Sequence, residues 1–107
     1  MRTVIKILEN VEKAVKDCYG YIDYDFCPED NAVSVRVFEY NEYAEYSEDF
    51  ERYDFNEITN ELLDELKTSC NDIAENVEFC VPSEADKKGY GYFNYLEILI
   101  TPLKEVI

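Results

Sequence analysis

The start of the chain carries apolar residues at the spacing of an α-helix. Between about Thr3 and Cys18 these residues recur at three- and four-residue steps: Val4, Leu8, Val11, Val15 and Cys18. Two lysines fall in the last turn, where the helix dipole favours cations, and Gly20 follows as a typical helix end. We therefore predict a single helix here. The alternative is a strand over residues 3–8 (TVIKIL), with a short helix that begins at Asn10.

The next two segments alternate between apolar and polar residues. In YIDYDFC (21–27) one face carries Ile22, Tyr24 and Phe26, and the other carries Tyr21, Asp23 and Asp25. This is the pattern of a strand with one solvent-exposed face. The residues PEDN that follow are typical of a turn. AVSVRVFEY (32–40) then aligns three valines on one face, which predicts the second strand of a β-hairpin.

The segment from Glu39 to Phe55 matches neither period. Its aromatic residues have helix-like spacing, but its acidic residues fall at almost every third position. Such carboxylates wind around a segment and do not line one side of it. We predict a loop that contains a short helix.

The clearest helix of the chain comes next. Asp54 and Glu57 make a plausible capping box. An apolar stripe follows: Phe55, Ile58, Leu62, Leu66, Ser69/Cys70 and Ile73. Beyond it we predict a strand over VEFCV (77–81), a loop over PSEADKKGYG (82–91) and a last strand over YFNYLEILI (92–100), with Pro102 closing it.

Two parts of the sequence resemble each other. YDFCPEDNAVSVRVFE and VEFCVPSEADKKGYGYFNYLEI both read as a strand ending in Phe-Cys, then a proline, acidic residues and a second strand. One interpretation is an α-β-β unit used twice; the other is chance among common strand residues. In either case residues 1–107 are expected to form a single α+β domain. We predict a two-layer fold: a four-stranded antiparallel sheet with two helices packed on one face.

Composition adds a strong negative charge to this picture. The 107 residues include 25 Asp and Glu against 10 Lys and Arg, for a net charge of -15, while 47% apolar residues are enough for a folded core. Sixteen acidic and two basic residues lie between Asp17 and Glu65, so this part carries -14. A clustered field of this kind attracts basic proteins and repels nucleic acids and anionic membranes.

The acidic segment therefore supplies the candidate partner-binding residues. Asp23 and Asp25 should stand about 6.6 Å apart along a strand, and Glu57, Glu61 and Asp64 should lie opposite the apolar stripe of their helix. These spacings are comparable to those of DNA phosphates. Interleaved tyrosines are favoured interface anchors, although single rings can also pack at the core edge. The full set is Asp23, Asp25, Glu39, Tyr40, Glu42, Tyr43, Glu45, Tyr46, Glu48, Asp49, Glu51, Tyr53, Asp54, Glu57, Glu61 and Asp64.

The sequence carries little catalytic equipment. It has no histidine, no phosphate-binding glycine loop and no complete calcium-binding loop. Its four cysteines (Cys18, Cys27, Cys70 and Cys80) form no CxxC pair, so we expect reduced, buried thiols and no metal or cofactor. We expect that the protein is not an enzyme. The start of the chain lacks a signal-peptide pattern, which leads us to expect a cytoplasmic protein of a bacterium or a phage-infected cell.

These observations lead to one main hypothesis and two alternatives. In composition the chain resembles the small acidic DNA-mimic proteins by which phages block CRISPR nucleases or restriction enzymes; the resemblance assigns no residues. It implies an inhibitor that occupies the basic nucleic-acid-binding site of a target protein. The alternatives are an immunity protein or antitoxin against a basic nuclease toxin, and a housekeeping interaction domain whose acidity serves solubility. Monomer and dimer both stay open.

Overall fold

A computed structural model describes residues 2–16, 21–38, 55–89 and 95–104 of the chain. Its elements, in chain order, are α1 (Arg2–Lys16), β1 (Tyr21–Cys27), β2 (Ala32–Phe38), α3 (Phe55–Ser69), β3 (Ala74–Cys80), α4 (Glu84–Lys88) and β4 (Tyr95–Pro102).

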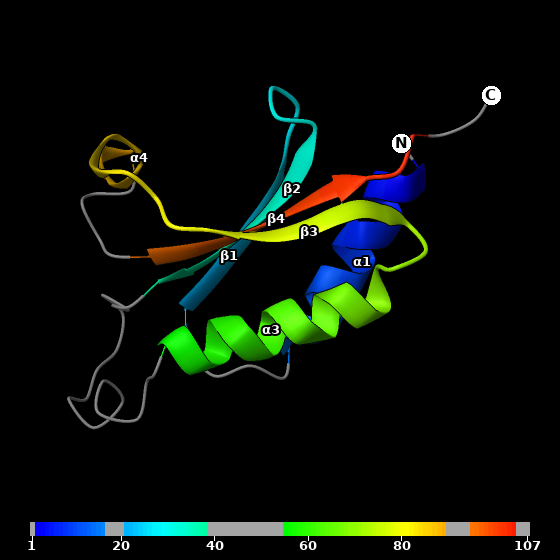
Figure 1. Cartoon of the computed structure of the whole chain (residues 1–107), viewed down its shortest axis with the longest axis horizontal. Coiled ribbons are helices and arrows are strands. Elements are labelled where there is room, and N and C mark those ends of the chain that lie inside the picture. Colours follow the sequence, from blue (N-terminus) through cyan, green and yellow to red (C-terminus); the bar gives the residue numbers. More distant parts are fainter. Residues whose placement is uncertain (1, 17–20, 39–54, 90–94, 105–107) are drawn as a thin grey trace.

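The four strands form one antiparallel sheet in the order β1-β2-β4-β3 (Figure 1). Two hairpins, β1–β2 and β3–β4, meet along their second strands, so β2 and β4 lie in the centre and β1 and β3 lie outside them. The helices α1 and α3 contact each other and pack on the same face of the sheet. The predicted α+β fold, with two helices on one face of a four-stranded antiparallel sheet, is thus confirmed.

The order of elements repeats along the chain. A 15-residue helix, a seven-residue strand and a central strand occur first as α1, β1 and β2, and again as α3, β3 and β4. The second hairpin differs because its connection holds the short helix α4. At the level of architecture, this agrees with the interpretation of an α-β-β unit used twice.

The core lies between the two long helices and the sheet. Ile7 and Val11 of α1 and Leu62 and Leu66 of α3 are fully buried against the central strands. On these strands the buried residues are Val33, Val35, Val37, Ile98 and Ile100. Burying each such side chain contributes about 1.5–3 kcal/mol, so this layer dominates the stability of the fold.

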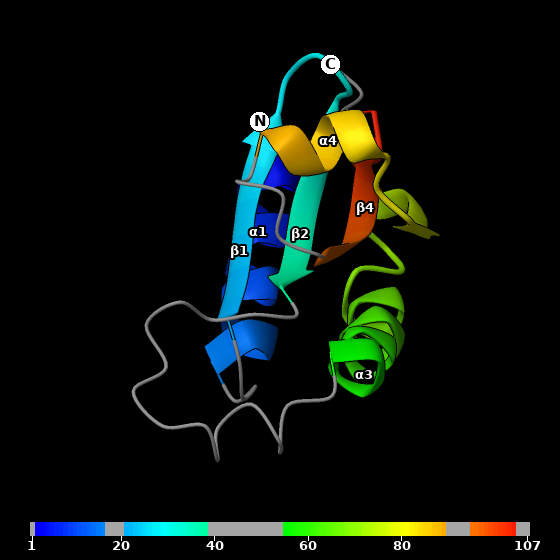
Figure 2. The same ribbon diagram turned by 90° about the vertical axis from the view of Figure 1, so that its left-hand side faces the viewer.

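The central strand β2 is buried on both of its faces. Its valines face the helices, and Ala32, Ser34, Arg36 and Phe38 alternate onto the opposite side. We call this opposite side the outer face of the sheet; Figure 2 shows α1 behind β1 and β2. On the outer face the ring of Phe38 contacts that of Tyr95, with centroids 5.3 Å apart.

Several sequence predictions hold, although the face of α1 that is fully buried includes Ile7 and Ala14, whereas the predicted Leu8 and Val15 are only partly buried. The first segment is a helix, not the alternative strand, and it is described as far as Lys16. The hairpin has the predicted strand β1 and a turn over residues 28–31. In this turn Asn31 has a positive φ of 48°, which Asn tolerates better than most residues, and donates its N–H to the Pro28 carbonyl. The predicted stripe of α3 is buried at Leu62, Leu66 and Cys70.

Other predictions need correction. The third strand begins at Ala74, three residues before the predicted start, because the chain turns directly after Cys70. The loop predicted over residues 82–91 was wrong in part, since it contains α4, whose N-cap Ser83 forms a capping box with Asp86. The last strand is described from Tyr95 and extends to Pro102. The loop predicted between residues 39 and 54 lies outside the described residues, as does Asp54 of the predicted capping box.

No helix among the described residues is both long enough and apolar enough to cross a bilayer.

Candidate partner-binding surface

The structure describes five of the sixteen predicted binding residues: Asp23, Asp25, Glu57, Glu61 and Asp64. The other eleven lie outside the described residues: Glu39, Tyr40, Glu42, Tyr43, Glu45, Tyr46, Glu48, Asp49, Glu51, Tyr53 and Asp54.

The five described residues do not form one surface. Asp23 and Asp25 belong to the outer face of the sheet, because the residues that alternate with them on β1 pack toward the core. Glu57, Glu61 and Asp64 lie on α3, which covers the other face. The structure therefore separates the strand carboxylates from the helix carboxylates by the thickness of the sheet.

The two strand carboxylates pair with a buried arginine. Arg36 lies opposite Asp23 in the β1–β2 register, and its Nη2 is 2.7 Å from the Asp23 carboxylate. Its Nη1 is 3.1 Å from the Asp25 carboxylate. The arginine side chain is only 3% exposed, while those of Asp23 and Asp25 are 45% and 57% exposed. These three residues together carry a charge of -1, so the outer face presents less negative charge than the sequence predicts.

Arg36 also extends this network toward β4. Its Nη1 donates to Ser34 Oγ at 3.0 Å, and Ser34 Oγ donates in turn to Glu97 Oε2 at 2.8 Å. Side chains from β1, β2 and β4 are thus joined through one buried guanidinium. We call Asp23, Asp25, Ser34, Arg36 and Glu97 the outer-face network. Its hydrogen bonds join three strands on the side of the sheet away from the helices.

The pKa values of one carboxyl group in the outer-face network and of two nearby thiols are shifted. The hydrogen bond from Arg36, aided by its positive charge, lowers the pKa of Asp25 despite the opposing effect of burial. Cys27 donates its thiol to Asp25 at 3.5 Å, and its pKa is raised by burial first and by the Asp25 charge second. Burial, then Glu78 and Glu97, raises the pKa of Cys80. Both thiols are therefore held in the protonated, weakly nucleophilic form. The expectation of buried thiols holds for Cys70, whereas Cys27 and Cys80 are half-buried.

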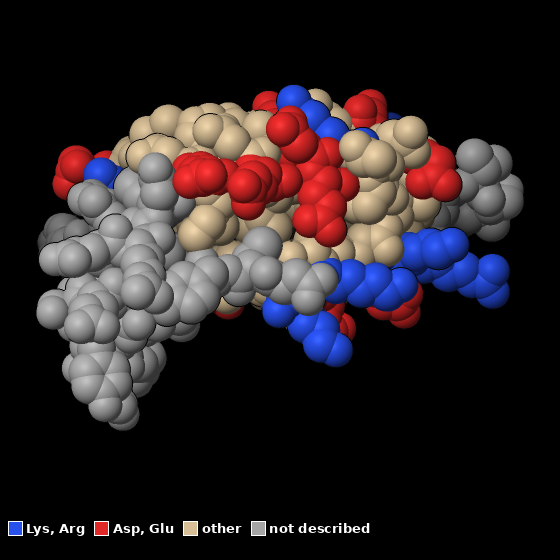
Figure 3. Space-filling view, turned by 90° about the horizontal axis from the view of Figure 1, so that it is seen from below, with Lys and Arg blue, Asp and Glu red and all other residues tan. Residues whose placement is uncertain are grey.

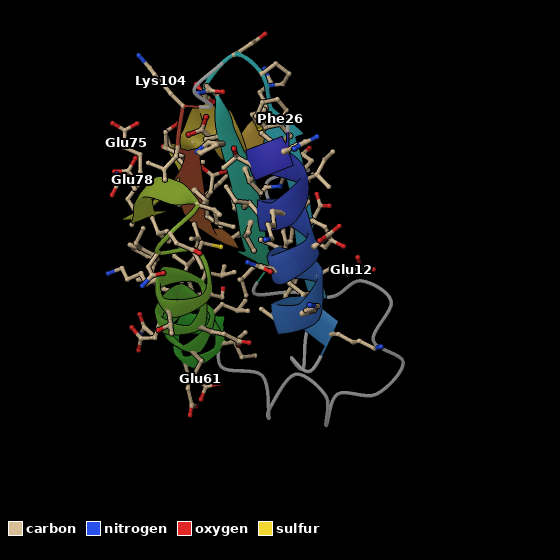
Figure 4. The ribbon with its side chains drawn as sticks, turned by 90° about the vertical axis from the view of Figure 1, so that its right-hand side faces the viewer. Glu12, Phe26, Glu61, Glu75, Glu78 and Lys104 are labelled. Carbon is tan, nitrogen blue, oxygen red and sulfur yellow. The ribbon has the colours of Figure 1, made fainter. Side chains whose placement is uncertain are left out.

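A second group of carboxylates lies on α3 and the neighbouring strand β3. All of its members are exposed, and α3 contacts β3 directly. We call this group the acidic flank: Glu57, Glu61, Asp64 and Glu65 of α3, with Glu75 and Glu78 of β3, the outermost strand, on which Glu78 lies on the outer face of the sheet. In Figure 4 the labelled Glu61, Glu75 and Glu78 lie along the same side of the molecule, and Glu12 of α1 lies on the other.

Half of the acidic flank was missed by the sequence prediction. Glu65 continues the four-residue spacing of Glu57 and Glu61, which was a usable signal. Glu75 and Glu78 lie in the nearly neutral part of the sequence, and the short turn after Cys70 folds their strand back beside α3. Carboxylates from two differently charged parts of the sequence are therefore brought close together in the fold.

The two long helices carry opposite net charges. The charges of α3 sum to -3, because the helix contains four carboxylates and one basic residue, Lys67. Those of α1 sum to +2, because Arg2 and three lysines outnumber Glu9 and Glu12. Figure 3, which views the molecule from the side of α3, shows acidic side chains gathered across the middle and the largest group of basic side chains along one edge, with a few more at the opposite edge. A positively charged partner would thus be attracted more strongly to α3 and β3 than to α1.

The carboxylates of the acidic flank are arranged so that they can contact positively charged side chains. Among the described residues, no three His, Cys, Asp or Glu side chains are grouped so that they could hold a metal ion. The acidic flank instead offers separate, solvated carboxylates on a rigid helix and strand, which can contact Lys and Arg side chains of a partner at several points.

No family model, curated protein or solved structure matches this chain.

Proposed function

We propose that this protein inhibits a basic, nucleic-acid-binding protein by occupying its cationic site with the acidic flank. The observation that carries this proposal is the placement of six exposed carboxylates on α3 and β3, while the adjacent helix α1 is net positive. A domain that needed charge for solubility alone would gain as much from carboxylates spread over both helices.

The geometry of the flank agrees with a phosphate-like surface. Glu57, Glu61 and Glu65 follow each other at four-residue steps on α3, so consecutive carboxylates rise by about 6 Å along the helix axis. A groove that binds a nucleic-acid backbone places Lys and Arg to meet regularly spaced negative charges. The helix ladder supplies such charges on a fixed support.

The α1 side of the molecule explains how binding could be oriented. Long-range attraction acts on the whole charge distribution, and a dipolar helical layer turns its negative side toward a cationic site during the encounter. The remaining carboxylates of the chain add to the attraction through the net charge of -15.

Competition with DNA tests this function. Basic DNA-binding proteins and nucleases are each loaded with a fluorescently labelled DNA duplex, and the full chain is titrated in while fluorescence anisotropy is followed. We expect displacement of the duplex from a target of this inhibitor. We also expect the displacement to weaken as salt rises, because exposed charges are screened beyond about 8–10 Å at physiological salt.

The chain offers a matched pair of variants for this assay. Glu61→Lys/Asp64→Lys reverses two charges three residues apart on α3, and Glu9→Lys/Glu12→Lys does the same on α1; all four residues are exposed. Both variants change the net charge equally. The α3 variant should weaken displacement by about tenfold or more and the α1 variant much less. Equal losses in the two variants would show that net charge alone acts, and would contradict the proposal.

A further inference from the structure

The strand β3 is an edge of the sheet. Among the described residues it pairs with β4 alone, so its other side carries backbone N–H and C=O groups that no neighbouring strand takes up. Such an edge is a template on which a further strand can be added. Because β3 contacts α3 and carries two carboxylates of the acidic flank, a partner that docks on α3 lies close to this edge.

The end of this edge is apolar and exposed. Phe79 is 42% exposed and Val81, directly after the strand, is 72% exposed. Phe79 lies opposite Ile98 and shares its face of β3 with Val77, whereas Glu78 alternates to the other face. A strand added here would therefore have apolar neighbours on one face and a carboxylate neighbour on the other.

Edge protection explains only part of this pattern. Charged residues and a bulge blunt edge strands against aggregation, and β3 has Glu75, Glu78 and a register shift between Ala74 and Asn76. Protection does not explain an exposed phenylalanine next to these charges. A second copy of the chain fits poorly, because two paired β3 strands would bring their glutamates into one sheet between molecules of charge -15 each.

We propose that β3 accepts an extended segment of the basic partner, in which Lys or Arg residues alternate with apolar residues. This inference rests on the proposed function and specifies how the partner is held. The backbone of the segment would pair with the edge of β3, its apolar side chains would cover Phe79, and its cations would lie beside Glu78.

Amide hydrogen exchange of the full-length chain, followed by NMR, tests the proposal. One probe is a peptide that alternates lysine and valine; its control has the same composition with the lysines and valines in two blocks. At about ten times the dissociation constant, the alternating peptide should slow exchange of the outward amides of residues 75–80 about tenfold. The amides of β1, the strand at the opposite edge of the sheet, serve as the internal control, and their exchange rates should not change.

The outcomes separate this inference from the proposed function. Protection by the alternating peptide that exceeds that of the block peptide, and that is lost in Phe79→Ser/Glu78→Lys, supports strand addition. Equal effects of the two peptides overturn strand addition, even if the wild-type chain displaces DNA from its target. A free chain that light scattering shows to be a dimer, and whose outward amides of residues 75–80 are already protected without peptide, also overturns it. Protection of β3 together with equal DNA displacement by the α1 and α3 variants would leave strand addition intact and contradict the proposed function.

Discussion

Arg36 and Asp23 face each other directly across the β1–β2 hairpin, with a guanidinium nitrogen 2.7 Å from a carboxylate oxygen. Arg36, one of the two basic residues between Asp17 and Glu65, is thus buried in the sheet. The acidity of β1 is therefore partly structural: Asp23 and Asp25 allow a cation to occupy the central strand, and that cation also orders Ser34. Removing the cation should affect folding before it affects binding.

We expect Arg36→Ala to lower the free energy of unfolding by about 2–4 kcal/mol. The substitution leaves Asp23 and Asp25 close together without their cation and removes the buried stem of the arginine from the outer face. Urea denaturation followed by circular dichroism measures the loss. Arg2→Ala is the control, because Arg2 is exposed and should change stability by less than about 0.5 kcal/mol. Equal effects of the two variants would show that the outer-face network contributes nothing to stability.

The outer-face network predicts that the folding stability depends on pH through the protonation of Asp25. Its pKa is lowered in the folded protein by the hydrogen bond from Arg36. A carboxyl whose pKa falls on folding contributes stability above its unfolded-state pKa of about 3.9, and this contribution is lost as pH falls through the lower, folded-state pKa. Asp25→Asn should therefore destabilise the protein near neutral pH, and the difference from wild type should shrink below about pH 4. Urea titrations at a series of pH values measure this, and a difference that stays constant with pH would contradict it.

The sequence predicted what depends on local pattern and missed what depends on sheet pairing. The spacing of apolar residues identified both long helices and the first hairpin, since their buried faces repeat with the period of each element. The role of Arg36 depends on the hairpin register that places Asp23 opposite it; the predicted turn over residues 28–31 sets this register, but the pairing and the burial of Arg36 were not predicted. The carboxylates of β3 were missed because the predicted strand began at Val77, whereas β3 begins at Ala74 and folds back beside α3 directly after the turn at Cys70.

Asn10 should hold the end of α3 against α1. Its Nδ2 donates to the Ser69 carbonyl at 3.1 Å, where the last helical carbonyls lack partners within the helix. Asn10→Ala loses this bond and gains helix propensity, whereas Asn60→Ala, at an exposed position of α3, gains the propensity alone. We expect Asn10→Ala to be less stable than Asn60→Ala by about 1 kcal/mol in urea denaturation. Equal stability of the two variants would mean that the contact contributes nothing.

The short helix α4 should depend on its N-cap. Ser83 Oγ accepts the Asp86 N–H at 3.2 Å, and the Ser83 N–H donates to the Asp86 carboxylate at 3.0 Å. Five residues form no stable helix by propensity alone, so Ser83→Ala should unfold α4 locally. Backbone chemical shifts of residues 84–88 would report this change. Global stability should stay within about 0.5 kcal/mol of wild type, because no residue of α4 is buried. A cooperative loss of the whole fold would contradict this local role.

The acidic ladder of α3 lowers the stability of its own helix. Glu61 stands four residues from both Glu57 and Glu65, and like charges at this spacing destabilise a helix by about 0.2–0.5 kcal/mol per pair. Asp64, three residues on, adds a third repulsion, so Glu61→Lys turns three repulsions into attractions and should raise the free energy of unfolding by about 1–2 kcal/mol at low salt, less at high salt. Glu12→Lys changes the net charge equally on α1 and serves as the control in the same urea titrations. If the flank is a binding surface, Glu61→Lys should also weaken displacement of DNA from the target, so that stability rises as inhibition falls. If Glu61→Lys raises stability and leaves DNA displacement unchanged, Glu61 does not contribute to binding of the target.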